Sequence, residues 1–185
     1  MSAGILTDAE FLVLGLVAEM PRHGYQLDQV IEERGMRRWT QISFSSIYFV
    51  LGRLEEMKLV AAKKAVGVKW RSKARKVYSV TPAGRRTLVT RTVAALREIR
   101  PAHSSVFLGM MHWPVLNRNQ ALQALRARLE ALEKEQTRLK EIQIAQQPLP
   151  DHVEALFEFS IGQLRVESEW VKRNLDYMSG KPWLD

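Results

Sequence analysis

The 185-residue chain is long enough for one medium domain or two small ones, and its hydrophobic fraction of 46% is sufficient for a packed core. Residues 1–100 hold 18 Lys and Arg against 9 Asp and Glu, and residues 101–185 hold 10 against 11, so the net charge of +8 divides into +9 and −1. This division indicates that the first half meets a polyanion, and the absence of cysteine excludes disulfides and thiolate metal sites.

The N-terminus lacks the basic start and apolar core of a signal peptide. No apolar run approaches the length that is needed to cross a bilayer. We therefore expect a soluble, cytoplasmic protein with no membrane partner.

Two helices are predicted at the start of the chain. Thr7-Asp8-Ala9-Glu10 has the form of a capping box, and it begins a mostly apolar helix that Pro21 ends. The next residues, 22–25, are expected to form a turn. A second helix then runs over about residues 25–34, and Gly35 ends it.

A third helix is predicted near residues 43–57 and completes a tri-helical core. Its apolar positions recur at the three-to-four spacing of one buried face: Ile47, Val50, Leu51 and Leu54. Ser45 and Ser46 can cap its N-terminus through their hydroxyl oxygens. Four of its residues lie off the apolar stripe: Tyr48, Phe49, Gly52 and Arg53.

Two short strands follow, joined by a basic segment. The first is Leu59–Ala62 and the second is Val77–Val80. Seven of the 14 residues from Lys63 to Lys76 are Lys or Arg, and none is acidic. Thr81-Pro82 then supplies an N-cap and a proline at the first helical position. The order of helix, strand, basic tip, strand and helix predicts a β-wing.

A β-wing with a basic tip beside a short helix fits duplex DNA. A duplex presents a dense row of phosphates, so Lys and Arg at a hairpin tip gain affinity by releasing condensed counterions. The short helix can enter the major groove next to the wing. A charged run is in other settings a solvated surface loop, but its position after a plausible recognition helix favours DNA binding. We therefore predict a winged helix-turn-helix.

Beyond the wing, the sequence predicts a helix over residues 82–99 that Pro101 ends, and then a packed turn or short helix up to residue 114. A long helix over residues 117–145 and a second amphipathic helix follow, separated by a Pro-containing break at residues 146–151. Two helices joined by so short a link should pack antiparallel as a hairpin. The predicted fold class is thus mainly α with a small β-wing.

This organisation has three parts: a winged helix-turn-helix DNA-binding domain over residues 1–90, a linker helix and turn over 91–116, and an antiparallel α-helical dimerisation domain over 117–185. Single winged helices read few bases, and two-fold pairing doubles the contacts. The apolar positions expected to serve dimerisation, in part through a coiled-coil heptad pattern, are Leu122, Leu125, Leu129, Leu132, Leu139, Leu164, Val171 and Leu175. Packing within one chain is the alternative role, and it accounts for part of the pattern.

An ordered set of short motifs carries a family resemblance. The motifs are Leu14-Gly15-Leu16, Pro21-Arg22-His23-Gly24-Tyr25, Ser46-Ile47-Tyr48, Leu51, Arg53-Leu54-Glu55, Leu59-Val60, Arg75-Lys76-Val77-Tyr78 and Thr81-Pro82-Ala83-Gly84. Over about residues 10–90 this set resembles the PadR family of transcriptional regulators. Residues 104–179 resemble the helical C-terminal domain of the longer PadR proteins, the type named after a virulence-gene activator.

The resemblance implies a homodimer that binds a pseudo-palindromic operator, usually as a repressor, with a small-molecule effector or a partner altering the outcome. The chain departs from the common family pattern at Phe44, Ser45 and Phe49, where family members often have proline, glycine and proline. Its wing also lacks the usual glycine-rich tip with acidic residues. These departures concern the base preference more than the fold.

The residues expected to contact DNA combine hydroxyl groups at helix starts with the cations of the wing. They are Tyr25, Ser45, Ser46, Tyr48, Arg53, Lys63, Lys64, Lys69, Arg71, Lys73, Arg75 and Lys76. Ser45, Ser46 and Tyr48 resemble the start of the family's recognition helix, where hydroxyls meet phosphates or base edges; capping alone is the alternative for the serines. Tyr25 is suited to a phosphate contact, or it packs on Trp39.

Other aromatic residues have two possible roles each. Trp39 and Trp70 are expected to support the core or the base of the wing rather than to stack on bases. Five aromatic side chains of the C-terminal half are candidates for an effector cavity, with ordinary core packing as the alternative: Phe107, Trp113, Phe157, Phe159 and Trp170.

Two other classes of protein fit the sequence less well. An enzyme is disfavoured because His23, His103, His112 and His152 are scattered and no glycine-rich phosphate loop is present, so we expect no cofactor and no metal. A protein-interaction scaffold built from a winged helix and a coiled coil, without specific DNA binding, is the main alternative. The concentration of positive charge in the first half argues against it.

Overall fold

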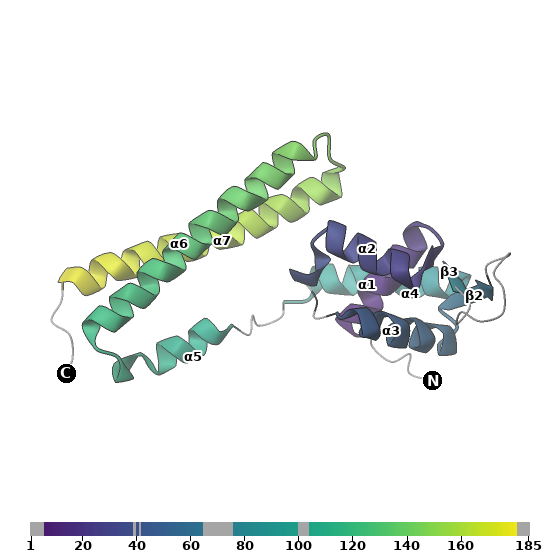
Figure 1. Cartoon of the computed structure of the whole chain (residues 1–185), viewed down its shortest axis with the longest axis horizontal. Helices are drawn as coiled ribbons and strands as arrows, with labels where there is room; N and C mark the ends of the chain where they lie inside the picture. Colours follow the sequence, from purple (N-terminus) through teal and green to yellow (C-terminus); the bar gives the residue numbers. More distant parts are fainter. Residues whose placement is uncertain (1–5, 39, 41, 65–75, 100–103, 181–185) are drawn as a thin grey trace. The chain divides into compact units, whose positions relative to one another are not determined.

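The computed structural model describes residues 6–38, 40, 42–64, 76–99 and 104–180, with the side chains of Arg38 and Lys64 left aside. It divides into two compact units, Met1–Arg100 and Pro101–Asp185 (Figure 1). The first unit contains helices and a small sheet, and the second is helical throughout its described residues. This confirms the predicted fold class of a mainly α protein with a small β-wing.

Helix α1 spans Asp8–Glu19 and begins at the predicted capping box. The backbone N–H of Thr7 donates to Glu10 Oε2 at 2.8 Å, and the N–H of Glu10 donates to Thr7 Oγ1 at 3.3 Å. Most of the helix is apolar because it is enclosed on several sides. Its buried apolar side chains are Val13, Leu14, Leu16 and Val17.

Helix α2 spans Gly24–Glu33, and the one-turn helix η1 spans Met36–Arg38. Gly35, which lies between them, has a φ of +64°, a left-handed conformation that glycine adopts at little cost. The predicted end of the second helix is therefore confirmed. Leu27 and Ile31 are its fully buried side chains.

Helix α3 spans Phe44–Glu56, and its N-cap is Ser43 rather than the predicted Ser45 or Ser46. Ser43 Oγ accepts a hydrogen bond from the backbone N–H of Ser46 at 3.3 Å. The helix begins where it was predicted, near residue 43, but Ser45 and Ser46 occupy its first turn instead of capping it. All three serines are suitable caps by residue type, and only the extended backbone at Ser43 decides among them.

Three antiparallel strands form the sheet in the order β1-β3-β2. Strand β2 (Val60–Lys64) pairs with β3 (Lys76–Val80), as the wing prediction requires. Strand β1 (Arg22–His23) pairs with the other edge of β3, with Arg22 opposite Tyr78. The expected turn at Arg22 and His23 is thus wrong, because two residues carry no alternation that would reveal a strand and the pairing partner lies far along the chain.

Helix α4 spans Pro82–Arg97 and starts at the predicted cap, where Thr81 Oγ1 accepts from the N–H of Gly84 at 3.0 Å. Leu88 packs against the core of the first unit. Further along the helix, Val89, Val93 and Leu96 are exposed. The apolar side of this helix therefore extends beyond the core of the unit to which it belongs.

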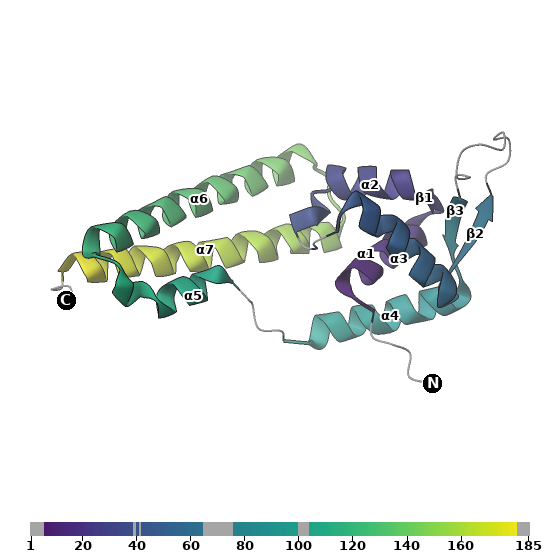
Figure 2. The ribbon, with the colours of Figure 1, turned by 60° about the horizontal axis from the view of Figure 1, so that its bottom comes forward.

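The second unit contains α5 (Ser105–Met111), the one-turn helix η2 (Trp113–Val115), α6 (Arg118–Ala145) and α7 (Asp151–Gly180). Figure 2 shows α6 and α7 side by side and antiparallel, as predicted. The guanidinium of Arg118, at the start of α6, donates to the carbonyls of Met178 and Ser179 at the end of α7, at 2.7 Å each. This contact fixes the register of the hairpin at one end.

The core of the hairpin contains most of the residues predicted for dimerisation. Leu125, Leu132 and Val171 are buried there. Four others are partly buried and packed against them: Leu122, Leu129, Leu164 and Leu175. Leu139 is half-buried. These side chains hold the two helices of one chain together, and a contribution to a dimer interface remains a prediction.

Polar contacts also specify how the two helices pair. Gln136 Nε2 donates to the buried Ser168 Oγ at 2.8 Å, which places one hydrogen bond inside an otherwise apolar seam. Lys172 Nζ lies 2.8 Å from Glu133 Oε1 at the edge of the same seam. Satisfied polar pairs of this kind favour one register over its neighbours. Among the described helices, none is long and apolar enough to span a membrane.

Candidate nucleic-acid interface

The outer side of helix α3 presents three aromatic rings to solvent. Phe44, Tyr48 and Phe49 are 48%, 49% and 67% exposed. The Phe44 and Tyr48 rings pack edge to face, with centroids 5.4 Å apart. The opposite side of the helix is packed into the core, because Ile47, Leu51 and Leu54 have no exposed surface. The packing of one face therefore fixes which residues the helix offers to a ligand.

A cluster of hydroxyl groups lies at the N-terminus of α3. Ser43 Oγ is 3.1 Å from Ser45 Oγ and 2.7 Å from Ser46 Oγ. Ser45 is exposed and Ser46 is half-buried. The first N–H groups of a helix and its dipole favour an anion at this end. The predicted pair Ser45 and Ser46 is thus placed where a phosphate oxygen could be bound.

The start of α2 lies against α3 at one close contact. A Cβ added to Gly24 would lie 2.7 Å from Tyr48 Cε1, so only glycine allows the ring to lie over the backbone there. The next residue, Tyr25, is 58% exposed, and its hydroxyl accepts from Gln29 Nε2 at 3.5 Å. The start of α2, where Tyr25 follows Gly24, therefore lies beside the Tyr48 ring, and the role of both tyrosines in DNA contact stays a prediction. Trp39, the alternative packing partner of Tyr25, lies outside the described residues.

Two of the predicted cations have acidic partners within the chain. Arg53 Nε lies 2.8 Å from Oε1 of Glu10, whose side chain is almost fully buried. Lys76 Nζ donates to Glu55 Oε2 at 3.1 Å, and this hydrogen bond raises the pKa of Lys76. Arg53 is thereby tied to α1, and Lys76 is held beside α3. Neither partner was expected, because each lies far from its cation in the sequence or on another element.

Of the remaining predicted wing cations, two lie among the described residues and four lie outside them. Lys63 is exposed on β2, and the backbone of Lys64 pairs with that of Lys76. The other predicted wing contacts, and the aromatic Trp70, lie outside the described residues: Lys69, Arg71, Lys73 and Arg75. In the sequence, residues 57–97 contain 12 Lys and Arg and no Asp or Glu. The segment that carries the wing is therefore basic throughout.

Phe44 and Phe49 were not predicted as contacts from the sequence, although both are exposed beside residues that were. Their signal was present in the sequence, since Phe49 lies off the apolar stripe of α3. Together with Tyr48 they form a group of exposed aromatic rings on one helix, and apolar patches of this kind mark binding surfaces. Phe44 and Phe49 therefore belong to the candidate interface.

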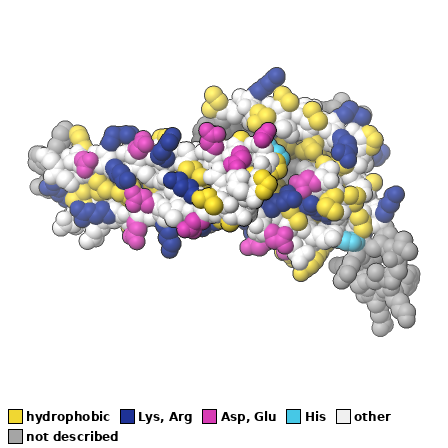
Figure 3. Space-filling model, turned by 90° about the horizontal axis from the view of Figure 1, so that it is seen from above, with side chains coloured by type: hydrophobic (Ala, Val, Ile, Leu, Met, Phe, Trp, Pro, Cys, Tyr) yellow, Lys and Arg dark blue, Asp and Glu magenta, His cyan; other side chains and the backbone are white. Residues whose placement is uncertain are grey.

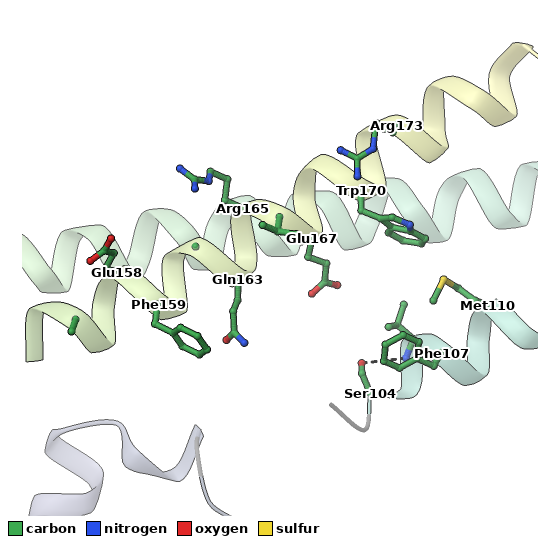
Figure 4. A pocket seen from close by; sticks show the side chains of 14 residues that line it. Ser104, Phe107, Met110, Glu158, Phe159, Gln163, Arg165, Glu167, Trp170 and Arg173 are labelled. Carbon is green, nitrogen blue, oxygen red and sulfur yellow. Dashed lines mark hydrogen bonds between the residues drawn. The ribbon is translucent and has the colours of Figure 1, made fainter. Parts of the chain in front are cut away.

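The second unit has a different surface. In Figure 3, side chains of both charge signs alternate along the visible face of the long helices, in agreement with the balanced charge of this half. A groove of about 950 Å³ lies between α5 and α7. Phe159 and Trp170 point from α7 toward α5, and Phe107 and Met110 lie on the α5 side (Figure 4).

Three of the five aromatic residues considered for an effector cavity line this groove: Phe107, Phe159 and Trp170. Trp113 packs instead against the core of the hairpin. Phe157 is half-buried and is not part of the groove lining. Within the described part of the chain, no three His, Asp or Glu side chains are grouped so that they could hold a metal ion.

The first unit has the architecture of a winged-helix domain. It contains the three helices α1–α3, the paired strands β2 and β3, and the following helix α4. Residues 13–90 match the model of the transcriptional regulator PadR-like family. The chain therefore carries a domain that matches the PadR-like family, and this domain lies in the first unit. No curated protein matches the chain.

Solved structures of PadR proteins share the fold over most of the chain. Bacillus subtilis PadR in complex with operator DNA has a TM-score of 0.72 at 17% identity, covering 91% of this chain and 98% of that one. The same protein in complex with p-coumaric acid has a TM-score of 0.73 at 16% identity, covering 92% and 98%. A PadR-like regulator from Bacillus cereus has a TM-score of 0.68 at 18% identity, covering 95% and 100%.

Proposed function

We propose that the chain is a sequence-specific DNA-binding regulator that acts as a homodimer on a pseudo-palindromic operator and represses transcription by occluding a promoter. The observation that carries the proposal is the outer face of α3, where Ser45, Tyr48 and the helix N-terminus are exposed beside a wing that is basic throughout. Bacillus subtilis PadR, which shares the fold, has been solved with operator DNA. A cytoplasmic location follows from this role.

In this proposal α3 enters the major groove and the wing follows the neighbouring backbone. Hydroxyls of Ser45, Ser46 and Tyr25 donate to phosphate oxygens, which positions the domain on the duplex. Cations of the wing neutralise further phosphates. Arg53 acts mainly through Glu10 by holding α3 against α1, because its Nε is already paired there.

The same proposal places a second copy of the chain on the groove of the helical unit. Several apolar side chains that line the groove or flank it are exposed within one chain: Phe107, Leu108, Phe159 and Val166. The lining also contains both Glu158 and Arg165, so the surface carries both charge signs. A two-fold interface brings a surface against itself, and such a mixed surface is self-complementary. A dimer would hold two wings at half-sites about one helical turn, or a multiple of it, apart.

A small-molecule effector is the remaining part of the proposal. Bacillus subtilis PadR has been solved with p-coumaric acid, an aromatic carboxylic acid. That compound is therefore the first probe to add to the operator complex. A fall in operator affinity at saturating p-coumaric acid would support an effector of this chemical class, and unchanged affinity would count against it.

Selection of bound genomic fragments tests the central claim. The purified full-length chain is incubated with sheared DNA from its own organism at near-physiological salt, and the bound fragments are sequenced. Enrichment of one inverted repeat is the expected result. Unselective recovery would contradict sequence specificity, and no recovery would favour the protein-interaction scaffold.

Replacing Arg71 or Lys73 with alanine is expected to weaken binding to all DNA sequences. Each lost phosphate contact should make the slope of log affinity against log salt shallower by about 0.9. Fluorescence anisotropy with operator and with unrelated DNA measures both quantities. Lys134→Ala, which removes an exposed cation from α6, is the control and should leave the slope unchanged. An unaltered slope in both wing variants would contradict their assignment to the DNA contact.

Replacing Glu55 with glutamine is expected to tighten DNA binding, because it releases Lys76 from its ion pair and removes a negative charge. We expect affinity to rise by about threefold and the salt slope to steepen by about 0.9 if Lys76 then binds a phosphate. Glu56→Gln removes the same charge from the neighbouring exposed position and is the matched control. Equal effects of the two variants would show that the Lys76 pair is not involved.

A further inference from the structure

The outer face of α3 lacks the residue types that usually read bases by hydrogen bonding. Arg, Lys, Asn and Gln make the bidentate contacts that identify guanine and adenine in the major groove. From Phe44 to Gly52 the helix contains none of them. The first such residue is Arg53, and its Nε is paired with Glu10. Base identity must therefore be read by other groups along this part of the helix.

What the helix does present is largely aromatic, since Phe44, Tyr48 and Phe49 are all exposed. Ser45, Tyr48, Phe49 and Gly52 are spaced by three and four residues and so share one face. Phe49 is 67% exposed, and among the described residues it is not one of the side chains packed against the core, so its ring is available to a ligand. The only apolar group on the major-groove edge of a base pair is the C5-methyl of thymine.

Charge identifies the occupant of this face as a polyanion rather than a protein. The chain between Glu56 and Glu98 contains 12 Lys and Arg and no acidic residue. This stretch supplies both strands that flank the basic segment, and β3 is joined to α3 through the ion pair of Lys76 with Glu55. The aromatic rings can contact the edge of a base pair, and the surrounding Lys and Arg side chains can contact the phosphates on either side of it.

On the basis of the DNA binding proposed above, we propose that Phe49 is a specificity-determining residue that reads thymine methyl groups in each operator half-site. Phe44 widens the apolar surface, since its ring is held edge-on against Tyr48. The hydroxyl of Ser45, one turn before Phe49, supplies a hydrogen bond to a neighbouring phosphate or base edge. A half-site therefore contains at least one thymine whose methyl group contributes to affinity.

Replacing thymine with deoxyuridine tests this directly, because it removes the methyl group and leaves every hydrogen-bonding group in place. The selected operator is synthesised with each thymine replaced in turn, and affinity is measured by fluorescence anisotropy. We expect one or two positions per half-site to lose about fourfold in affinity, the value of one buried methyl group. All other positions should be unaffected.

The protein side of the experiment assigns the effect to Phe49. Phe49→Ala should bind the thymine operator more weakly and should no longer distinguish thymine from deoxyuridine at the sensitive position. Met20→Ala removes another exposed apolar side chain of the same unit and should keep the full distinction. Because Phe49 is exposed, thermal unfolding followed by circular dichroism should be the same for the variant and the wild type.

Two results would overturn the inference while leaving the proposed function intact. One is an operator that is bound specifically but tolerates deoxyuridine at every position. The other is a Phe49→Ala variant that retains the methyl effect. If the wild-type chain selects no DNA sequence at all, the proposed function fails together with this inference.

Discussion

Replacing Gly84 with alanine is expected to destabilise the winged-helix unit by about 3 kcal/mol or more. An added Cβ would lie 2.0 Å from the carbonyl oxygen of Leu59 and 2.9 Å from Val80 Cγ2. The carbonyl cannot retreat freely, because it accepts hydrogen bonds from Thr81 N–H at 3.0 Å and from Thr81 Oγ1 at 3.1 Å. The close approach of α4 to Leu59, between α3 and β2, therefore depends on glycine.

Urea unfolding followed by circular dichroism measures this loss, and amide hydrogen exchange in β2 and β3 locates it. Gly52→Ala is the matched control, because nothing lies within 4 Å of a Cβ added at this helical position. It should stabilise the helix by about 0.5–1 kcal/mol. A Gly84→Ala protein as stable as the wild type would contradict the packing of α4 against Leu59.

The same substitution at two positions of α7 is expected to give opposite results. Val171 has no exposed surface in the hairpin core, whereas Val166 is 61% exposed in the groove. Val171→Asp should destabilise the hairpin by about 3 kcal/mol or more, because it buries a charge without a partner. Val166→Asp should leave the hairpin folded and, in the proposed assembly, separate the dimer.

Circular dichroism reports the helix content of both variants, and sedimentation equilibrium reports their mass. We expect Val166→Asp to be helical and monomeric, with operator affinity reduced because two half-sites are no longer bound together. A helical Val166→Asp protein that remains dimeric would place the interface on another surface. A stable, fully helical Val171→Asp protein would contradict the burial of this residue between α6 and α7.

Elements with strong local signals could be predicted from the sequence. The capping box at Thr7 and the cap at Thr81 depend on residues three positions apart, so both are visible in a single short motif. The break between α6 and α7 was found for the same reason, since it is defined by consecutive residues. Strand β1 was missed because two residues show no alternation and their pairing partner β3 lies far along the chain. The cap at Ser43 was missed because Ser45 and Ser46 are equally suitable by residue type.

The residues of the candidate interface likewise fall into those that the sequence predicted and those that only the structure revealed. Ser45, Ser46 and Tyr48 were identified because they follow one another at the start of an amphipathic helix. The ion pairs of Arg53 with Glu10 and of Lys76 with Glu55 were not predicted, because they depend on how elements distant in the sequence pack. The exposure of Phe49 was indicated by its position off the apolar stripe, whereas that of Phe44 became clear only once the rest of α3 was packed.

The sequence by itself therefore determined the order of the long helices and the two wing strands, the basic character of the wing and the resemblance to the PadR family, since each is set by residue types at short spacing. Only the tertiary structure decided which leucines close the hairpin of one chain and which apolar side chains remain exposed. The physical reason is that a helical period marks an apolar face but not its partner. That partner is decided by which surfaces pack together when the whole chain has folded.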